Sequence, residues 1–265
     1  MNILGIGNAI IDVLCKVPDE FLTKNSLTKS TMKLINEEEF RKLLSSLKIE
    51  ETVSGGSVAN SIVGLAQLGN NVGFIGKVNN DEFGQKYENG LINEKVKYLY
   101  EKKEEKIPTG SCLILITPDS ERTMCTFLGT AGKINDTDIK KEYIQSAEII
   151  FLEGYLWDEG DPKKAFDKAI MHSKKIAMSL SDLFCVNRHK PHFLELVKNQ
   201  LNIIFANEQE ILSLIDAKDF QEAVSFSKQI KKNIVITRGD RGAISVNGDE
   251  IIEVNAQSDL NIKDL

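Results

Sequence analysis

The chain has 265 residues, of which 42% are hydrophobic and 27% charged, and its formal net charge is -6. This length and composition fit one large α/β domain with a small appendage and exclude a disordered chain. The negative charge argues against nucleic acid and anionic membranes as partners, because binding to phosphate groups usually requires a basic surface.

The sequence also predicts where the protein works. No apolar run approaches the roughly 20 residues that a membrane-spanning helix needs, and no basic leader follows Met1. The four cysteines show neither a CxxC pair nor a metal-ligand spacing. We therefore expect a reduced, cytoplasmic protein that does not interact with membranes.

The first segment, residues 2–13, is apolar almost throughout, as in a central strand that is covered on both faces. Its polar exceptions are Asn8 and Asp12. Ligands of open α/β sheets bind at the carboxyl ends of strands, so Asp12 is placed to accept hydrogen bonds from substrate hydroxyl groups. A single Asp after a strand is also a common turn residue, and this segment leaves both interpretations open.

Residues 54–60 (SGGSVAN) carry the strongest functional signal. Gly55 and Gly56 allow a ligand to approach the backbone, and the apolar spacing that follows predicts a helix up to Gly69. Asn60 lies in the first turn of that helix, where its amide can bond a hydroxyl in the glycine gap. A Gly-Gly turn followed by a helix cap explains the same glycines equally well.

The middle of the chain predicts a capped helix and then a hairpin. Asn36 and Glu39 have the spacing of a capping box at a helix start. Two extended runs, residues 111–117 and 122–128, predict a hairpin, and no helix follows them at once, so we expect a flap outside the main sheet. Arg122 begins the second run, where its guanidinium can reach a phosphate, although arginines are also common on hairpin surfaces.

From residue 149 onward strands and helices alternate. We expect strands at 149–152, 176–180, 203–206 and 234–237, and helices at 162–174, 191–199, 208–215 and 220–231. This alternation indicates βαβ units, and it predicts an α/β fold with a mainly parallel sheet and helices on both of its faces.

Two polar motifs follow strands in this half. Asn207 and Glu210 begin a helix, where they form a capping-box pair or, alternatively, bind nucleotide phosphate and hydrated Mg²⁺. Thr237, Gly239 and Gly242 precede a hairpin rather than a helix, so they form neither a Walker loop nor a dinucleotide fingerprint. A plain glycine turn and a phosphate-facing backbone both remain open for them.

In this order, the motifs resemble those of the ribokinase-like (PfkB-type) family of carbohydrate and nucleoside kinases, over essentially the whole chain. The similarity lies in the first signature, the metal-linked motif and the nucleotide motif, at residues 55–60 with 76–84, 207–210 and 237–242. The flap and residues 153–156 are most similar to the adenosine-kinase-like sugar kinase branch.

The resemblance implies ATP-dependent phosphorylation of a primary hydroxyl on a sugar or nucleoside. It implies one ribokinase-like domain over residues 1–265, with a β-lid at about residues 14–35 and 107–132 through which two chains can pair as a homodimer. The acceptor hydroxyls would be bound under this lid by Asn8, Asp12, Gly55, Gly56 and Asn60. Phosphoryl transfer needs positioning and charge stabilisation more than covalent help from the protein.

The resemblance assigns the remaining motif residues to the nucleotide. Asn207, Thr237, Gly239 and Gly242 would line the ATP site. Glu210 would hold Mg²⁺ through water. In a catalytic role, Arg122 would close over the transferring phosphoryl group.

The sequence departs from the family pattern at its end. Family members continue with a glycine-rich turn that forms an anion hole and ends in the Asp that acts as general base. Asp264 matches only the opening Asp of that motif. We therefore expect the C-terminal part of the domain, with the base, to be missing from this sequence, and one sheet face to be open. The alternative function is a catalytically incomplete carbohydrate- or nucleoside-binding protein.

Overall fold

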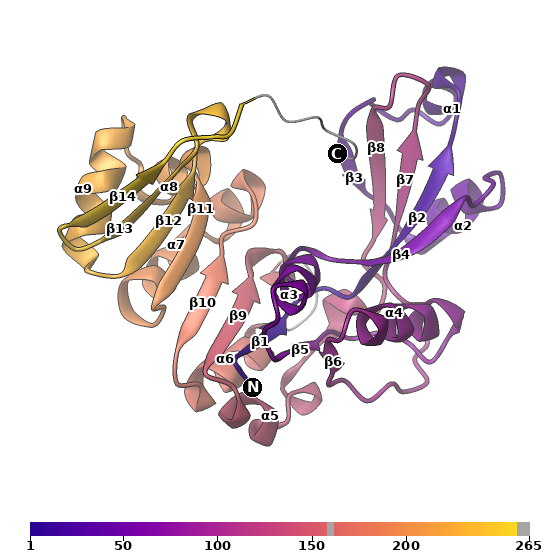
Figure 1. Ribbon diagram of the computed structural model, residues 1–265. Helices are drawn as coiled ribbons and strands as arrows, with labels where there is room; N and C mark the ends of the chain where they lie inside the picture. Colours follow the sequence, from indigo (N-terminus) through magenta and orange to yellow (C-terminus); the bar gives the residue numbers. More distant parts are fainter. Residues whose placement is uncertain (158–161, 259–265) are drawn as a thin grey trace.

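The computed structural model describes residues 1–157 and 162–258, whose strands form two sheets (Figure 1). The large sheet has the order β14-β13-β12-β11-β10-β9-β1-β5-β6. Its strands are β1 (Ile3–Ile6), β5 (Val72–Ile75), β6 (Lys97–Tyr98), β9 (Ile149–Glu153), β10 (Ile176–Ser179), β11 (Ile203–Asn207), β12 (Asn233–Thr237), β13 (Ala243–Asn247) and β14 (Glu250–Val254). All neighbours are parallel except β13 and β14, which confirms the mainly parallel α/β fold.

The small sheet has the order β3-β8-β7-β2-β4. Its strands are β2 (Ile10–Lys16), β3 (Met32–Leu34), β4 (Glu51–Gly55), β7 (Ser111–Ile116) and β8 (Arg122–Phe127). The antiparallel pair β7 and β8 is the predicted hairpin. The sheet extends beyond the ranges expected for the lid, because β2 begins at Ile10 and β4 lies outside both ranges.

Helices cover the two faces of the large sheet unequally. One face packs against α6 (Pro162–His172), α7 (Leu183–Asn199), α8 (Glu208–Ile215) and α9 (Phe220–Ile230), with α5 (Lys141–Ser146) beside α6. On the other face α3 (Ser57–Gln67) contacts β1, β5 and β9. The remaining helices, α1 (Asp19–Lys24), α2 (Glu37–Leu44) and α4 (Glu82–Asn93), lie beside the small sheet (Figure 1).

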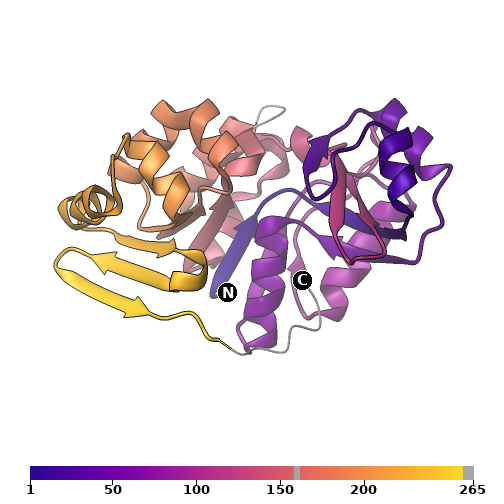
Figure 2. The same ribbon diagram turned by 90° about the horizontal axis from the view of Figure 1, so that it is seen from above.

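The second face of the large sheet is open over β10 to β14. Within the described residues no helix lies on this part of the face (Figures 1 and 2). Phe205 is 38% exposed there, and its ring meets that of Phe151 with the centroids 5.7 Å apart. A cavity of about 420 Å³ with a mostly apolar lining lies between this face and α3. The structure therefore exposes an apolar sheet face over these strands.

Residues 2–13 do not form the single central strand that we expected. β1 ends at Ile6 and belongs to the large sheet, whereas β2 begins at Ile10 and belongs to the small one. Gly7 allows the chain to cross, because a Cβ there would lie 2.7 Å from a carboxylate oxygen of Glu153. Both strands are apolar, so their pattern hides the change of sheet. Asp12 consequently lies within a strand of the small sheet, not after a central strand.

The helix expected at residues 191–199 is longer than predicted. α7 begins at Leu183, after Asp182, whose side chain accepts a hydrogen bond from the backbone N–H of Cys185 at 2.6 Å. Pro191 lies inside it, just after a kink at His189, where φ is -115°. Pro191, where we expected the helix to begin, is accommodated inside it by this kink.

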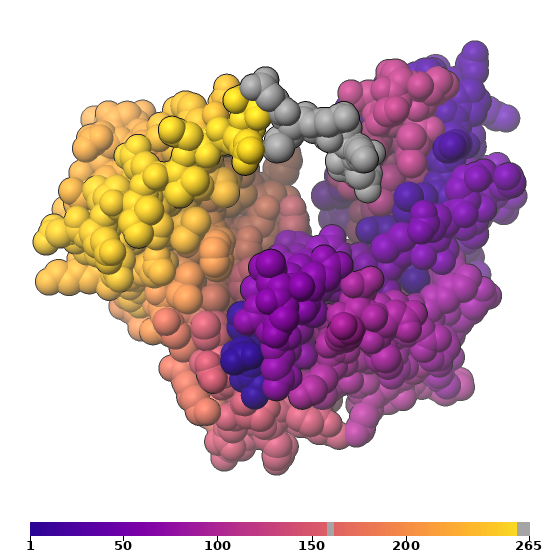
Figure 3. Space-filling view, in the orientation of Figure 1, coloured from indigo at the N-terminus to yellow at the C-terminus, as the bar shows by residue number. Residues whose placement is uncertain are grey.

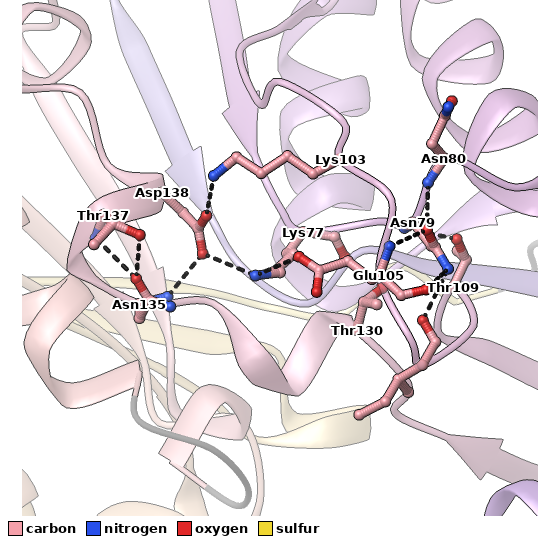
Figure 4. A network of polar contacts seen from close by, with 11 residues as sticks. Lys77, Asn79, Asn80, Lys103, Glu105, Thr109, Thr130, Asn135, Thr137 and Asp138 are labelled. Atoms are coloured by element: carbon pink, nitrogen blue, oxygen red, sulfur yellow. Dashed lines mark hydrogen bonds and ion pairs between the residues drawn. The ribbon is translucent and has the colours of Figure 1, made fainter.

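A polar network joins the segments that enter and leave the small sheet (Figure 4). The buried Lys77, in the turn after β5, has its Nζ 3.0 Å from Glu105 and 3.4 Å from Asp138. The side chain of Asp138 is 1% exposed and also lies 3.4 Å from the Nζ of Lys103. Glu105 precedes β7 and Asp138 follows β8, so this network fixes both ends of the hairpin to the large sheet.

Residues 76–84, the second part of the signature that begins at residues 55–60, stabilise the same region. Asp81 caps α4 by accepting a hydrogen bond from the N–H of Gly84 at 2.8 Å, and it accepts two more from Thr109, at 2.6 and 2.9 Å. The side chain of Asn79 donates to the carbonyl of Glu105 at 3.0 Å. A Cβ at Gly84 would lie 1.9 Å from the carbonyl oxygen of Asn79. These residues therefore have structural reasons for their spacing.

Three smaller expectations can be compared with the structure. The capping box of Asn36 and Glu39 is present at the start of α2. All four cysteines are buried, and none of them forms a disulfide. None of the described helices has the length and apolar character needed to cross a membrane.

Candidate active site

The first group of candidate residues lies between the two sheets. Asp12 projects against Gly55, where a Cβ would lie 2.2 Å from the Oδ2 atom. Glycine is therefore required at 55 for the carboxylate to approach the backbone of β4. Burial raises the pKa of the Asp12 carboxyl to about 6. A partly desolvated carboxylate of this kind is a strong acceptor for a ligand hydroxyl.

Asn8 and Gly56 form a second pair of residues in close contact. Gly56 has a φ of 108° at the N-cap of α3, and a Cβ there would lie 2.3 Å from the carbonyl oxygen of Asn8. The side chain of Asn8 is buried, and its Oδ1 atom has no hydrogen-bond partner among the described residues. A buried acceptor without a donor is costly, so this oxygen indicates a site for a donating ligand.

Glu153, at the end of β9, connects the loop that contains Asn8 to the start of α3. Its side chain is fully buried, and its two oxygens accept hydrogen bonds from the backbone N–H of Asn8 at 2.7 Å and of Val58 at 3.0 Å. Burial raises its pKa to about 7, although the hydrogen bonds oppose the shift. We gave this residue no role from the sequence. The signal was a Glu directly after an apolar strand, which is the argument that we applied to Asp12.

The structure brings four of the five expected acceptor residues together: Asn8, Asp12, Gly55 and Gly56. Asn60 follows in the first turn of α3, where its backbone N–H donates to the carbonyl of Gly56 at 2.9 Å. Its side chain is exposed, so it stands at the margin of the group. Figure 3 shows the surface hollowed between the small sheet and the β10–β14 part of the large sheet.

The second group lies at the carboxyl ends of β11 and β12, where Asn207 and Thr237 are register partners. Asn207 and Glu210 form a complete capping box at the start of α8. One Glu210 oxygen accepts from the backbone N–H of Asn207 at 2.9 Å, and the other accepts from its side-chain amide at 2.7 Å. The capping-box interpretation, left open by the sequence, is therefore confirmed. It does not exclude a role in ligand binding.

The surroundings of Glu210 limit how it can serve a metal. Its side chain is buried, which raises the pKa of its carboxyl, and the charge of Asp182 raises it further. Within the described residues, no three His, Cys, Asp or Glu side chains form a group that could hold a metal. Mg²⁺ keeps several of its waters and needs few carboxylates, so Glu210 fits Mg²⁺ through water without leaving the cap.

The two glycines after β12 have different tasks. Gly242 has a φ of 80°, and a Cβ there would lie 1.9 Å from the carbonyl oxygen of Val254, so the turn into the hairpin requires glycine. Gly239 has a φ of 60°, but a Cβ there would meet nothing within 4 Å. The backbone at Gly239 is thus open to a ligand, whereas Gly242 is explained by the fold.

Two arginines that we did not single out lie beside this group. The carboxylate of Glu208 is 3.3 Å from the Nε atom of Arg238 and 2.6 Å from the Nη2 atom of Arg241. The guanidinium of Arg238 also stacks over the ring of Phe220 at 4.0 Å. The pattern RGDR at 238–241 was a usable signal, because cationic side chains near glycines favour phosphate binding.

Arg122 is not adjacent to either group. It begins β8 next to the hairpin turn, opposite Ile116. Asp12 is in register with Cys112 and, through it, with Thr126, which lies four residues further along β8. Arg122 therefore lies on the same face of the small sheet as Asp12, but at the end remote from the large sheet. Asp264, the remaining residue of the expected motifs, lies outside the described residues.

The fold and the two residue groups can now be compared with known proteins. The fold is that of ribokinase-like α/β proteins. Residues 27–264 match the model of the pfkB family of carbohydrate kinases, and the chain belongs to this family.

Two solved structures are similar over nearly the whole chain. The adenosine kinase from Sinorhizobium meliloti is 32% identical, with a TM-score of 0.89, and the alignment covers 99% of this chain and 82% of that one. A probable sugar kinase from Rhizobium etli CFN 42 is 34% identical, with a TM-score of 0.86 and coverage of 97% and 79%.

A curated relative of lower identity matches most of the chain. The guanosine-inosine kinase of Escherichia coli is 25% identical over 234 residues, which are 82% of this chain and 53% of that protein. The chain thus spans about half the length of the curated relatives that it matches first.

Proposed function

We propose that the protein transfers the terminal phosphoryl group of ATP to a primary hydroxyl of a sugar or nucleoside. The observation that carries this proposal is the unpartnered Oδ1 of the buried Asn8, whose backbone lies against Gly56 while the carboxylate of Asp12 lies against Gly55. Membership of the pfkB family and the likeness to an adenosine kinase and a probable sugar kinase support it.

In this proposal the first group binds the acceptor. The oxygen of Asn8 and the carboxylate of Asp12 accept hydrogen bonds from its hydroxyls, and Gly55 and Gly56 let its ring approach the backbone. Asn60 contacts it from the margin. Binding in this way orients the acceptor, and orientation is the largest contribution that a protein makes to phosphoryl transfer besides charge stabilisation.

The second group binds the nucleotide. Thr237 and the open backbone at Gly239 contact the ATP phosphates, Gly242 shapes the turn, and Asn207 contacts a phosphate from the start of α8. Mg²⁺, when bound through water near Glu210, would neutralise phosphate charge. Arg122 acts only if the small sheet closes over the acceptor, which would bring its guanidinium toward the transferred group.

The reaction can be tested by identifying its product. The full-length protein is incubated with ATP, Mg²⁺ and each of adenosine, guanosine, inosine, ribose and fructose, and the products are analysed by mass spectrometry. We expect one class of acceptor to gain a phosphate, and its analogue without the primary hydroxyl to gain none. An acceptor that binds in calorimetry while no phosphate is transferred would instead support the non-catalytic binding protein.

The metal assignment has a separate test in the Glu210→Gln variant. Glutamine can keep the bond to the backbone N–H of Asn207 and removes the negative charge, but its amide group replaces the oxygen that accepts from the Asn207 side chain. The Mg²⁺ concentration for half-maximal turnover should rise several-fold, while the unfolding midpoint falls only slightly. An unchanged Mg²⁺ curve would leave Glu210 with the cap as its only role.

A further inference from the structure

Helix α4 packs against β4, the strand that ends in Gly55 (Figure 1). Two hydrogen bonds join these elements. The Ser54 hydroxyl donates to the backbone carbonyl of Tyr87 at 2.9 Å, and the Tyr87 hydroxyl donates to the carbonyl of Gly55 at 3.1 Å. A Cβ at Gly90, three residues further along α4, would lie 2.1 Å from the Ser54 hydroxyl oxygen. The middle of α4 is therefore fixed against the last two residues of β4.

The ring of Tyr87 is enclosed by the protein core. Its side chain is fully buried, and the ring lies beside those of Phe74 and Tyr98, with the centroids 6.3 and 6.0 Å away. Burial raises the pKa of the Tyr87 phenol well above its ordinary value, and the charges of Glu153 and Asp12 raise it further. The hydroxyl therefore keeps its proton near neutral pH and remains a hydrogen-bond donor to the carbonyl.

Gly55 is held between two side chains. The carboxylate of Asp12 lies against its Cα, and the hydroxyl of Tyr87 holds its carbonyl. The pairing of β4 with β2 ends at this residue, opposite Ile10, so the strand ladder does not define the backbone beyond it. Gly56 follows with a φ of 108°, and glycine has the widest choice of backbone conformations. Because a peptide unit is planar, the bond from Tyr87 orients the whole peptide between the two glycines.

A buried phenol also needs a hydrogen-bond partner for folding alone. The neighbouring Tyr98 is such a case, because its hydroxyl donates to the carbonyl of Gly76 at 2.7 Å. Gly76 follows β5 and is not one of the residues that we assign to the acceptor or to the nucleotide. Tyr87 and Tyr98 thus make the same kind of bond within one aromatic cluster, and they differ in the glycine that they hold.

We propose that Tyr87 is a positioning residue: its hydroxyl holds the peptide between Gly55 and Gly56 in the orientation to which the acceptor binds. This inference rests on the proposed function for what binds beside these glycines. Tyr87 is fully buried and acts through Gly55 without touching the acceptor. Without its bond, the two glycines must be ordered when the acceptor binds, and this cost appears as weaker binding. The bound arrangement stays the same, so kcat does not change.

The Tyr87→Phe variant of the full-length protein tests this inference, because it removes one hydroxyl and keeps the ring. Tyr98→Phe is the matched control. Each variant leaves one glycine carbonyl without its donor, so both should lower the free energy of unfolding by a similar amount. In Tyr87→Phe alone, the KM for the acceptor should rise about three- to tenfold, which corresponds to one hydrogen bond. Its kcat and its KM for ATP should equal those of the wild type.

Amide hydrogen exchange provides a second measurement that needs no acceptor. Exchange in a peptide that covers residues 54–60 should become faster in Tyr87→Phe and stay unchanged in Tyr98→Phe. Unchanged exchange there in both variants would overturn the inference, whether or not the protein is a kinase. An equal rise of the acceptor KM in both variants would also overturn it, because the effect would then follow stability alone. If no acceptor were phosphorylated, the proposed function would fail, and the exchange measurement would still decide the inference.

Discussion

The backbone N–H of Asn8 donates a 2.7 Å hydrogen bond to the carboxylate of Glu153, a residue 145 positions away in the sequence. The contact holds the crossing between β1 and β2 against the end of β9. The same carboxylate accepts from Val58 at the start of α3. One buried side chain thus fixes the distance between the two loops that we assign to the acceptor.

This position of Glu153 makes the stability of the protein depend on pH. Its pKa in the folded state, about 7, lies above the ordinary 4.5. The folded state therefore binds more protons between these values, and the free energy of unfolding should fall as pH rises from 4.5 through 7. A shift of this size corresponds to on the order of 3 kcal/mol. Asp12, with a pKa of about 6 in place of 3.8, adds a decrease of the same sign at lower pH.

The Glu153→Gln variant isolates the contribution of Glu153. It should be less stable at all pH values, because its amide places a donor against a backbone N–H. Between pH 6 and 7.5 its unfolding free energy, measured with urea, should be nearly flat where that of the wild type falls. An equally steep decrease in the variant would show that Glu153 does not titrate in this range.

Gly55→Ala should damage function more than folding. The added Cβ would lie 2.2 Å from the Oδ2 atom of Asp12, so the carboxylate must move. A displacement of about 1 Å can cost roughly 10- to 100-fold in kcat/KM. Gly64→Ala, in the same helix-loop unit, is the control, because a Cβ there meets nothing within 4 Å. It should leave kinetics unchanged and raise stability by up to about 1 kcal/mol. Equal kinetics in both variants would remove Asp12 from the site.

Lys77→Met should destabilise the protein by about 3 kcal/mol or more, because it leaves the carboxylate of Asp138 buried with one cation fewer. Lys103→Met removes a lysine whose side chain is 53% exposed, and its cost should stay within about 1 kcal/mol. Urea unfolding of both variants measures the difference. Replacing Lys77 and Asp138 together, by Met and Leu, should recover part of the loss. Similar losses for the two lysine variants would show that burial does not matter here.

The open face of the large sheet should cause a polypeptide of residues 1–265 to associate. Phe205 lies on this face and is 38% exposed, whereas Phe184 is 70% exposed on α7. Phe205→Ser should weaken self-association, measured by sedimentation, by about tenfold, since one large apolar side chain is worth on the order of 1.5 kcal/mol or more. Phe184→Ser should have no effect. A wild-type polypeptide that sediments as a monomer would contradict this expectation.

Local patterns in the sequence predicted local structure well. The alternation after residue 149 gave the parallel sheet, and the Asn207–Glu210 spacing gave a capping box that the structure contains. Such features depend on residues within one or two turns of each other. The predicted start of α7 was wrong, because Pro191 lies inside the helix, just after a kink, and not at its first turn.

The features that the sequence did not reveal depend on contacts between distant segments. The change of sheet after Ile6 is set by Gly7 and the buried Glu153, and neither residue differs in pattern from those of an ordinary strand end. The small sheet is assembled from four separate stretches, so the apolar face around Asp12 becomes visible only with the strand register. The paired arginines at Glu208 belong to the same class of long-range contact.

The central claim is that the group formed by Asn8, Asp12 and the two glycines holds the hydroxyl acceptor of a kinase. The most direct measurement compares acceptor-dependent ADP formation by the full-length wild type, Asp12→Asn and a control, Asp249→Asn, in the exposed turn between β13 and β14. We expect wild-type and control rates to agree and kcat/KM of Asp12→Asn to fall by about 30- to 100-fold, the equivalent of one charged hydrogen bond. An Asp12→Asn protein that phosphorylates its acceptor at the wild-type rate would contradict the account.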